Sequence, residues 1–369
     1  MTLYWLLFAT ASSLALISSN RTFSNNNYFQ LYRINALWWI VIILLSLIIG
    51  LRHEVGGDWS GYLKIFDLID SDDFTTSSIS LMMDPGYLYL NMLVSSMGIT
   101  VHGVNFIAAV VFSVGLATFC RQLPRPLLAL AIAIPYLTIV VAMGYSRQSL
   151  ALGLSMIAFS YLRNDAVWKF SFFILIAATF HKTAITLIPL LLASQAANRA
   201  ALIFWGICLA PILYFLFLSD SIAFLLEHYV LNIEEGFVSQ GALIRVGMNA
   251  VPAVIFLAYS SRFIFNRSDY NWLRLFSWAT IACLIGLLMS DASAAIDRLA
   301  LYLLPLQLLV FSYLPDAFTD NRRIKQLITI GILFYYGFVL FVWLNFGVHS
   351  QEWLPYKNIL FYYAPSTNS

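Results

Sequence analysis

The stretch NALWWIVIILLSLIIGL, residues 35–51, contains no charged side chain and is apolar at nearly every position. A soluble helix keeps a polar face toward water, and this stretch offers none. An uncharged apolar run of about this length can cross the roughly 30 Å hydrocarbon core of a bilayer as a helix. The stretch therefore predicts a membrane-spanning helix.

Similar apolar runs recur through the chain and predict about 12 transmembrane helices, the first of them a retained N-terminal span. They lie near residues 1–18, 35–51, 101–119, 127–144, 147–162, 167–180, 183–196, 200–218, 244–260, 272–289, 298–314 and 327–344. No soluble domain interrupts them. We expect an all-α polytopic membrane protein that forms a single integral membrane domain over residues 1–369.

The composition agrees with this fold class. Of the 369 residues, 61% are hydrophobic and only 10% are charged, and the mean hydropathy is +0.81. Soluble domains carry about 25% charged residues. These values exclude a cytosolic enzyme, a nucleic-acid-binding protein and a disordered chain. The three cysteines lie at or within apolar runs, which favours small buried hydrophobes over disulfides or a metal site.

The segment DPGYLYLNMLVSSMG, residues 84–98, decides the topology, because a span there would reverse the side of every later loop. Without a span, most of the 20 basic residues lie on one face. With a span, most of them move to the opposite face. Basic residues mark the cytoplasmic side. Residues 84–98 are therefore expected to form a re-entrant or interfacial segment outside, and both termini are expected outside.

The outer face then holds most of the polar side chains. It carries all five histidines and every acidic residue except Asp165, Asp269, Asp316 and Asp320. The cytoplasmic loops are short and basic, which leaves little room for a site. Because polar groups at span ends are costly and often functional, we expect the functional site at the outer ends of the spans.

The sequence RHEVGGDWSGY, residues 52–62, follows the second apolar run. It offers a cation, Arg52, an imidazole and two carboxylates, including Asp58, beside glycines that allow tight backbone geometry. A solvated loop at a helix end is the plain alternative.

Two arginines open later spans and are candidates for binding a phosphate. Arg147 follows Tyr145 in the sequence GYSRQ, and Arg298 follows Asp297 in the sequence DRLALY, which ends at Tyr302. A guanidinium binds phosphate through two parallel hydrogen bonds, and a helix N-terminus adds partial positive charge. The alternatives are a snorkelling side chain for Arg147 and a local Asp297–Arg298 pair.

The sequence FHKT places His181 and Lys182 between two apolar runs. Imidazole titrates near neutral pH and suits a general acid or base, and the adjacent lysine can assist with phosphate. A histidine that only makes a structural hydrogen bond is the alternative.

Residues 219–245 show apolar positions at helical spacing with acidic residues between them, which predicts an amphipathic helix on the outer membrane surface. The segment ends at Arg245. Together with residues 52–100 it would cover the site. We find no HExxH, CxxC or paired-histidine motif, so no metal ligand is assigned.

Five of these motifs, in order, resemble those of the EpsG/Wzy-type bacterial polysaccharide polymerase family. They are RHEVGGDWSGYLKIF, DPGYLYLNMLVSSMG, YSRQSLALGLSMIAFSYLRN, FHKTAITLIPLLL and DRLALYLLP, and they cover about residues 35–315. Asp84 stands where the family often has Glu, and Trp59 stands where it often has another aromatic residue.

The resemblance implies a multi-pass protein of the bacterial inner membrane on a GT-C-like scaffold. It implies metal-independent glycosyl transfer, without a cofactor, at the periplasmic face. The substrates would be glycan repeat units linked to undecaprenyl pyrophosphate, for exopolysaccharide, O-antigen or lipopolysaccharide synthesis. The expected partners are these lipid-linked glycans, the bilayer and a chain-length regulator protein, with no nucleic acid.

Such a reaction needs cations for the departing pyrophosphate and a base for the acceptor hydroxyl. The base is expected to be His181, with Asp58 as the rival candidate. The pyrophosphate candidates are Arg52, Arg147, Lys182, Arg245 and Arg298. The sugar-binding candidates are Trp59, Tyr62, Asp84, Tyr87, Tyr145 and Tyr302.

Two other functions are compatible with this sequence. An O-antigen ligase-type transferase would use the same donor and the same face of the membrane. A transporter of lipid-linked glycans would place charges near the middle of the bilayer, often on broken helices. Here the charges lie at span ends, which favours a transferase.

Overall fold

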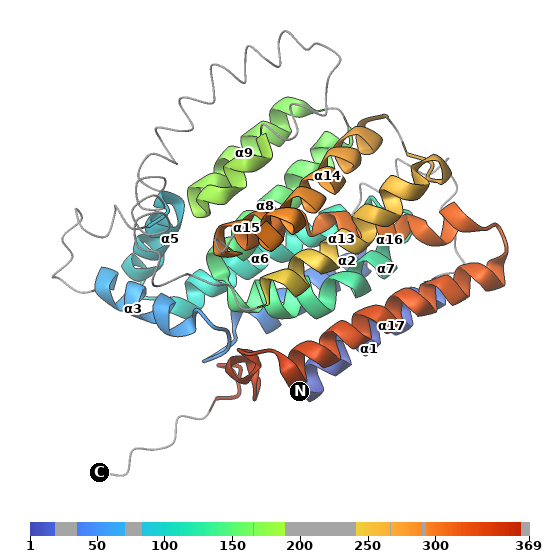
Figure 1. The fold of residues 1–369 in the computed structure, drawn as a ribbon. Helices are drawn as coiled ribbons and strands as arrows, with labels where there is room; N and C mark the ends of the chain where they lie inside the picture. The colour runs from blue at the N-terminus through green and yellow to red at the C-terminus, as the bar shows by residue number, and fades with distance from the viewer. Residues whose placement is uncertain are drawn as a thin grey trace, which may run out of the picture. The chain divides into compact units, whose positions relative to one another are not determined.

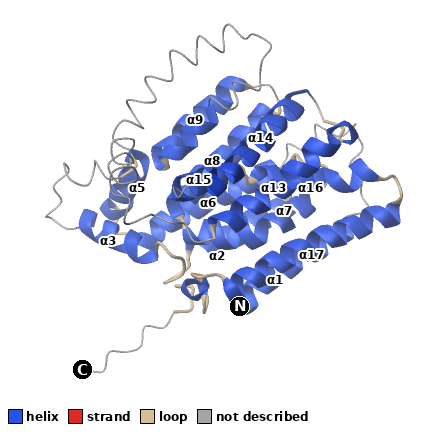
Figure 2. Ribbon diagram, viewed as in Figure 1, coloured by secondary structure: helices blue, strands red, loops and turns tan. Residues whose placement is uncertain are grey.

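A computed structural model describes most of the chain. The described residues are 1–18, 35–70, 83–164, 166–188, 241–265, 267–289 and 293–362. The predicted span 200–218 and residues 219–240 of the predicted amphipathic helix lie outside these ranges, as does most of the predicted span 183–196. The described residues form helices and connecting loops, without a β-strand (Figure 2). The expected all-α fold is therefore confirmed for this part of the chain.

The chain divides into two compact units, which are described separately. The first unit comprises Met1–Ile157, Thr179–His181 and Thr329–Ser369, and the second comprises Ala158–Ala178 and Lys182–Ile328. The prediction of one integral membrane domain concerns how these units combine, and it stays a prediction.

Four described helices are long and apolar enough to cross a membrane. They are Val101–Arg121, Ala242–Arg262, Asp269–Met289 and Arg322–Phe346. Four shorter apolar helices accompany them at Thr2–Ser18, Ala36–Gly50, Pro126–Ala142 and Val167–Phe180. A multi-pass membrane protein is therefore confirmed, whereas the total of about 12 spans stays a prediction.

The first unit contains most of the helices that carry candidate site residues. They are α1 (Thr2–Ser18), α2 (Ala36–Gly50), α3 (Trp59–Asp70), α5 (Pro85–Ser96), α6 (Val101–Arg121), α7 (Pro126–Ala133) with its π-helical continuation Ile134–Ala142, α8 (Ser146–Leu162) and α17 (Arg322–Phe346). Only residues 146–157 of α8 and residues 329–346 of α17 belong to this unit.

Close helix contacts set the framework of the first unit. The helix α2 begins after Asn35, whose side chain accepts a hydrogen bond from the Trp38 amide at 3.2 Å, and it packs along α6 (Figure 1). Helices α6 and α8 touch through Gly115 and Gly153, where a Cβ on Gly115 would overlap the Gly153 carbonyl. This backbone contact fixes the middle of α8 relative to α6.

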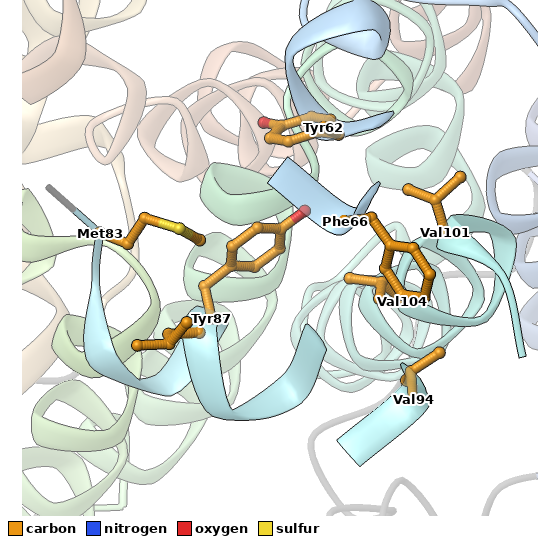
Figure 3. Close-up of a cluster of buried hydrophobic side chains, with 8 residues drawn as sticks. Tyr62, Phe66, Met83, Tyr87, Val94, Val101 and Val104 are labelled. Carbon is orange, nitrogen blue, oxygen red and sulfur yellow. The ribbon is translucent and has the colours of Figure 1, made fainter. Parts of the chain in front are cut away.

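Helices α3 and α5 have 12 residues each, about 18 Å at 1.5 Å per residue. That is too short to cross the roughly 30 Å bilayer core, which agrees with a non-spanning role for residues 84–98. The two helices pack their apolar faces on the start of α6 (Figure 3). The buried cluster consists of Tyr62, Phe66, Met83, Tyr87, Leu88, Val94, Val101 and Val104.

Residues 347–362, called here the C-terminal segment, fold back onto the first unit. Trp353 is completely buried, and its indole N–H donates to the Ile139 carbonyl at 2.8 Å. The carbonyl of Trp353 accepts a hydrogen bond from the Tyr4 hydroxyl at 2.7 Å. The segment therefore connects α1 and the π-helical turn following α7.

The C-terminal segment also pairs with the loop of residues 51–58. The His53 amide donates to the Lys357 carbonyl, and the Gly56 amide donates to the Glu352 carbonyl, both at 3.0 Å. The Lys357 ammonium donates to the Glu54 carboxylate at 2.5 Å. The loop after α2 is therefore held in place by residues about 300 positions later in the chain.

The second unit contains the remaining described helices. They are α9 (Val167–Phe180), the short helix Lys182–Thr186, α13 (Ala242–Tyr259), the short helix Ser260–Arg262, α14 (Arg267–Met289), α15 (Ser293–Leu301) and α16 (Pro305–Phe318). The last two residues of α9 belong to the first unit. The apolar run 298–314 is not one uninterrupted helix, because α15 ends at Leu301 and α16 begins at Pro305; whether it crosses the membrane stays a prediction. Proline has no backbone N–H and favours the first position of a new helix.

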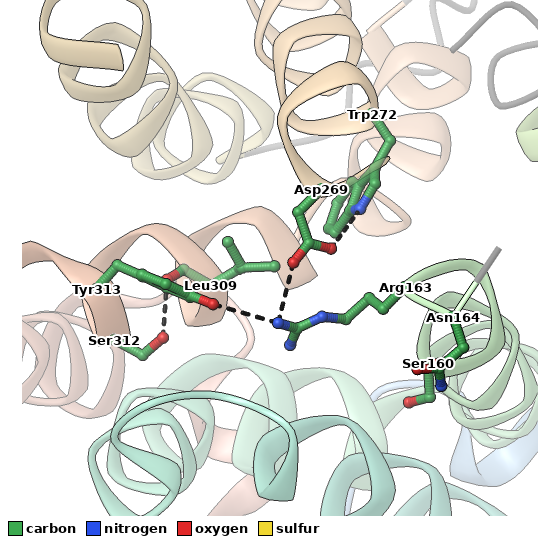
Figure 4. Close-up of polar contacts among 8 residues, drawn as sticks. All are labelled: Ser160, Arg163, Asn164, Asp269, Trp272, Leu309, Ser312 and Tyr313. Atoms are coloured by element: carbon green, nitrogen blue, oxygen red, sulfur yellow. Dashed lines mark hydrogen bonds and ion pairs between the residues drawn. The ribbon is translucent and has the colours of Figure 1, made fainter. Parts of the chain in front are cut away.

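A buried ion pair joins three helices of the second unit. Arg163, directly after α8, lies 3.0 Å from the Asp269 carboxylate in the first turn of α14 and donates to the Tyr313 hydroxyl of α16 at 3.2 Å (Figure 4). The Trp272 indole N–H donates to the same carboxylate at 3.2 Å. Arg163 therefore has a structural role in addition to the positive charge that it contributes to a cytoplasmic loop in the predicted topology.

Candidate functional site

Arg147, in the first turn of α8, lies at the centre of the candidate site in the first unit. Its guanidinium is 3.7 Å from the Asp84 carboxylate, and its side chain is 30% exposed. The same guanidinium lies 5.9 Å from the ring centroid of Tyr62 and 5.8 Å from that of Tyr87. Because the Arg147 side chain is partly exposed, its guanidinium can still bind an anion although aromatic rings and one carboxylate surround it.

The two tyrosines link Arg147 to the loop before α3. Their rings are 5.7 Å apart (Figure 3), and the Tyr62 hydroxyl donates to the Asp58 carboxylate at 3.2 Å. Burial raises the pKa of both phenols well above the usual value. The phenols therefore stay protonated at neutral pH, and the proton acceptors among these side chains are the carboxylates of Asp58 and Asp84.

His181 follows the end of α9 and reaches α8 from another direction. Its Nε2 lies 3.3 Å from the side-chain nitrogen of Gln148, the residue after Arg147. The preceding residue, Phe180, packs against the cluster that contains Tyr62 and Tyr87. The first unit thus brings His181 to the same turn of α8 that carries Arg147.

The start of α5 packs tightly on the end of α9. A Cβ added to Gly86 would overlap the Thr179 hydroxyl, so only glycine permits this approach. Asp84 and Tyr87 flank Gly86, and His181 follows Thr179 by two residues. The contact therefore holds the acidic and aromatic part of the site close to the histidine.

Arg52, the other arginine predicted to bind phosphate in this unit, lies in a different environment. Its side chain is almost completely buried, and all three guanidinium nitrogens donate hydrogen bonds to protein acceptors. Burial lowers the pKa of Arg52 to about 10, so it remains a cation at neutral pH. This geometry favours a structural role over contact with a ligand.

Two further aromatic candidates lie near these residues. The Trp59 ring, at the start of α3, is 5.7 Å from the His53 ring and 5.3 Å from the His102 ring. The two imidazoles are joined by a nitrogen–nitrogen contact of 3.1 Å. Tyr145 directly precedes α8 and is half-buried. The sugar contacts expected for Trp59 and Tyr145 stay predictions.

The remaining candidates belong to the second unit. Arg245 binds the Asp297 carboxylate through two nitrogens, so Asp297 has a partner besides its neighbour in the chain. Arg298 is exposed, whereas Tyr302 is buried. Lys182 begins a short helix. The pyrophosphate and sugar contacts expected for these residues stay predictions.

A sequence profile of the EpsG family matches residues 35–358, which is most of the chain. The chain belongs to the EpsG family. No curated protein and no solved structure gives a significant match. The expected family is confirmed, and membership of the EpsG family indicates a membrane-embedded polysaccharide polymerase.

Some residues that shape the site in this EpsG family member were not among the predicted ones. Asn105 is buried in α6 and contacts both Arg52 and Ser146. A lone asparagine in an apolar span is a recognisable signal. The C-terminal segment, with Trp353 and Lys357, carries no comparable signal, because its role depends on contacts with distant parts of the chain.

Proposed function

We propose that this protein joins glycan repeat units linked to undecaprenyl pyrophosphate at the periplasmic face of the bacterial inner membrane. The acceptor sugar hydroxyl attacks the anomeric carbon of the donor glycan. The bond between that carbon and the pyrophosphate oxygen breaks, and undecaprenyl pyrophosphate leaves with the electron pair. The pyrophosphate is already activated, so no nucleotide is needed.

The observation that carries this proposal is the position of Arg147. A cation that is partly exposed and surrounded by aromatic side chains suits a pyrophosphate whose negative charge grows during departure. The rings of Tyr62 and Tyr87 are buried, and they flank the guanidinium at 5.9 and 5.8 Å. Within the proposal, Arg147 binds the pyrophosphate and the two tyrosines orient its guanidinium.

The acceptor hydroxyl must lose a proton during the transfer, and His181 is our proposed base. His181 contacts the side chain of Gln148, the residue that follows Arg147. Imidazole accepts a proton near neutral pH. Asp58, which is linked to Tyr62, is the alternative base. After the transfer, the base releases the proton to water.

An in vitro assay of chain growth tests the proposal. The purified protein in lipid nanodiscs receives a lipid-linked repeat unit, and the length of the product is followed over time. We expect Arg147→Ala to slow growth by about 10²-fold or more and His181→Ala by about 10²-fold.

Exposed residues of the same types provide matched controls. Arg323→Ala and His349→Ala change side chains that lie on the surface, and both variants should polymerise normally. Near wild-type growth in both Arg147→Ala and His181→Ala would contradict the proposal. Movement of the lipid-linked unit across the membrane without any change in glycan length would indicate a transporter.

A further inference from the structure

Three buried polar side chains meet where α2, α6 and α8 come together. A nitrogen of Arg52 donates to the Ser146 hydroxyl at 2.8 Å and to the Asn105 carbonyl oxygen at 3.4 Å. The Ser146 hydroxyl donates to the same oxygen of Asn105 at 2.5 Å. All three side chains are shielded from solvent.

The donor and acceptor roles in this network are fixed by chemistry. A guanidinium only donates, so the Asn105 oxygen must face Arg52 and its amide nitrogen must point away. That nitrogen is buried without a hydrogen-bond partner. An unpaired buried donor costs free energy. The hydrogen bonds that the Asn105 oxygen accepts from Arg52 and Ser146 offset this cost and fix the orientation of the amide.

The other nitrogens of Arg52 bind the chain on both sides of it. One donates to the Ile49 carbonyl at the end of α2 at 2.7 Å, and another donates to the Val55 carbonyl at 3.1 Å. The side chain of Arg52 thus joins the end of α2, the following loop and the start of α8.

A second contact joins the same loop to the start of α8. Gly56 has a φ of 106°, a conformation that favours glycine, and a Cβ there would overlap the Met143 carbonyl. Met143 lies three residues before Ser146. The loop therefore touches both the first residue of α8 and the chain three residues before it.

Ser146 directly precedes Arg147, so the hydrogen bonds that fix Ser146 also fix the position of the Arg147 backbone. We infer that Arg52, Asn105 and Ser146 form a positioning network that holds Arg147 in place, and that Arg52 does not contact the substrate. The inference rests on the proposed function, in which Arg147 binds pyrophosphate. It assigns a role to Asn105 and Ser146 and replaces the phosphate contact predicted for Arg52.

Amide hydrogen exchange tests, independently of function, whether the network stabilises the first turn of α8. The full-length protein in nanodiscs is compared with Ser146→Ala, which removes the central hydroxyl. We expect faster exchange in the first turn of α8. The matched control is Ser155→Ala, because that buried serine of α8 binds only the Ala151 carbonyl of its own helix among the contacts described. It should leave the first turn unchanged.

Calorimetry with inorganic pyrophosphate tests the consequence for binding. Ser146→Ala and Arg52→Lys should each weaken binding about ten-fold, since each loses a buried hydrogen bond that involves a charged group. Ser146→Thr retains the hydroxyl and should restore most of the affinity. Ser155→Ala should bind like the wild type.

A double-mutant cycle separates positioning from general destabilisation. If Ser146 acts through Arg147, Ser146→Ala should have little further effect on pyrophosphate binding once Arg147→Ala is present. Equal losses in both backgrounds would overturn the inference. So would loss of binding in Arg52→Lys with full binding in Ser146→Ala, because Arg52 would then contact the ligand itself.

Together, the hydrogen-exchange and binding experiments distinguish a failure of the positioning network from a failure of the proposed function. If Ser146→Ala leaves the exchange of the first turn at the level of Ser155→Ala, the positioning network is overturned. If exchange rises as expected but Arg147→Ala binds pyrophosphate like the wild type, the network still holds α8 and the proposed function fails instead.

Discussion

The carboxylate of Asp84 and the guanidinium of Arg147 are 3.7 Å apart, close enough for an ion pair but too far for a direct hydrogen bond. Asp84 stands at the N-cap position of α5 without capping that helix through its side chain. A negative charge here neutralises part of the cation that we propose for pyrophosphate. An arriving anion must therefore compete with Asp84.

The variant Asp84→Asn removes this competing charge and keeps a similar shape. We expect several-fold tighter binding of inorganic pyrophosphate, measured by calorimetry, together with slower chain growth if the carboxylate contacts the sugar. Asp67→Asn is the control, because Asp67 is an exposed carboxylate of the neighbouring α3. Weaker binding in Asp84→Asn would mean that the carboxylate holds Arg147 in its binding position.

At the scale of elements, the loop of residues 51–58 depends on glycine and on the C-terminal segment. Gly56 has a positive φ and no room for a Cβ, whereas Gly61, in α3, has nothing within 4 Å of the position a Cβ would take. Two glycines five residues apart therefore have very different tolerance for substitution.

Gly56→Ala should lower both thermal stability and chain growth, because it strains the backbone and displaces the loop from α8. Gly61→Ala should unfold at the wild-type temperature or slightly above it, since alanine is the better helix former. Thermal unfolding and the polymerisation assay measure both variants. Equal behaviour of the two would show that the loop is not held as described.

The contact between Glu54 and Lys357 should make the C-terminal attachment depend on pH. The hydrogen bond from Lys357 lowers the pKa of Glu54 below its usual value. The resulting stabilisation is present at neutral pH and is lost as the pH falls through that lowered pKa. The effect should be small, because both side chains are largely exposed.

Lys357→Met removes this contact. Its unfolding temperature should lie slightly below that of the wild type at neutral pH, and the difference should disappear in acid. Melting curves across this pH range measure the effect. A difference that persists in acid would mean that the methionine acts through packing instead of charge.

At the scale of the whole molecule, the basic residues predict that both termini lie outside the cytoplasm. Alkaline phosphatase, which is active only outside, should work when fused to the C-terminus, and green fluorescent protein should fluoresce when fused after Asp320. The reverse pattern would place the proposed site in the cytoplasm and contradict the proposed polymerisation at the periplasmic face.

Much of the fold could be predicted because the bilayer imposes a simple rule on sequence. Backbone polar groups must be bonded within the membrane, so apolar runs become helices. The run at 35–51 became α2, and the short segment 84–98 became a helix too short to span. The break at Tyr302–Leu304 was missed, because an apolar run continues through it and only Pro305 marks the new helix.

Motifs and hydropathy are local properties, so they were sufficient to predict an all-helical membrane protein of the EpsG family and to propose Arg147 and His181 as site residues. These local properties did not distinguish Arg147 from Arg52, because both are arginines at the boundary of an apolar run. Only the tertiary structure buried Arg52 against Ser146 and Asn105 and left Arg147 partly exposed. Burial depends on which distant segments pack together, and local sequence does not contain that information.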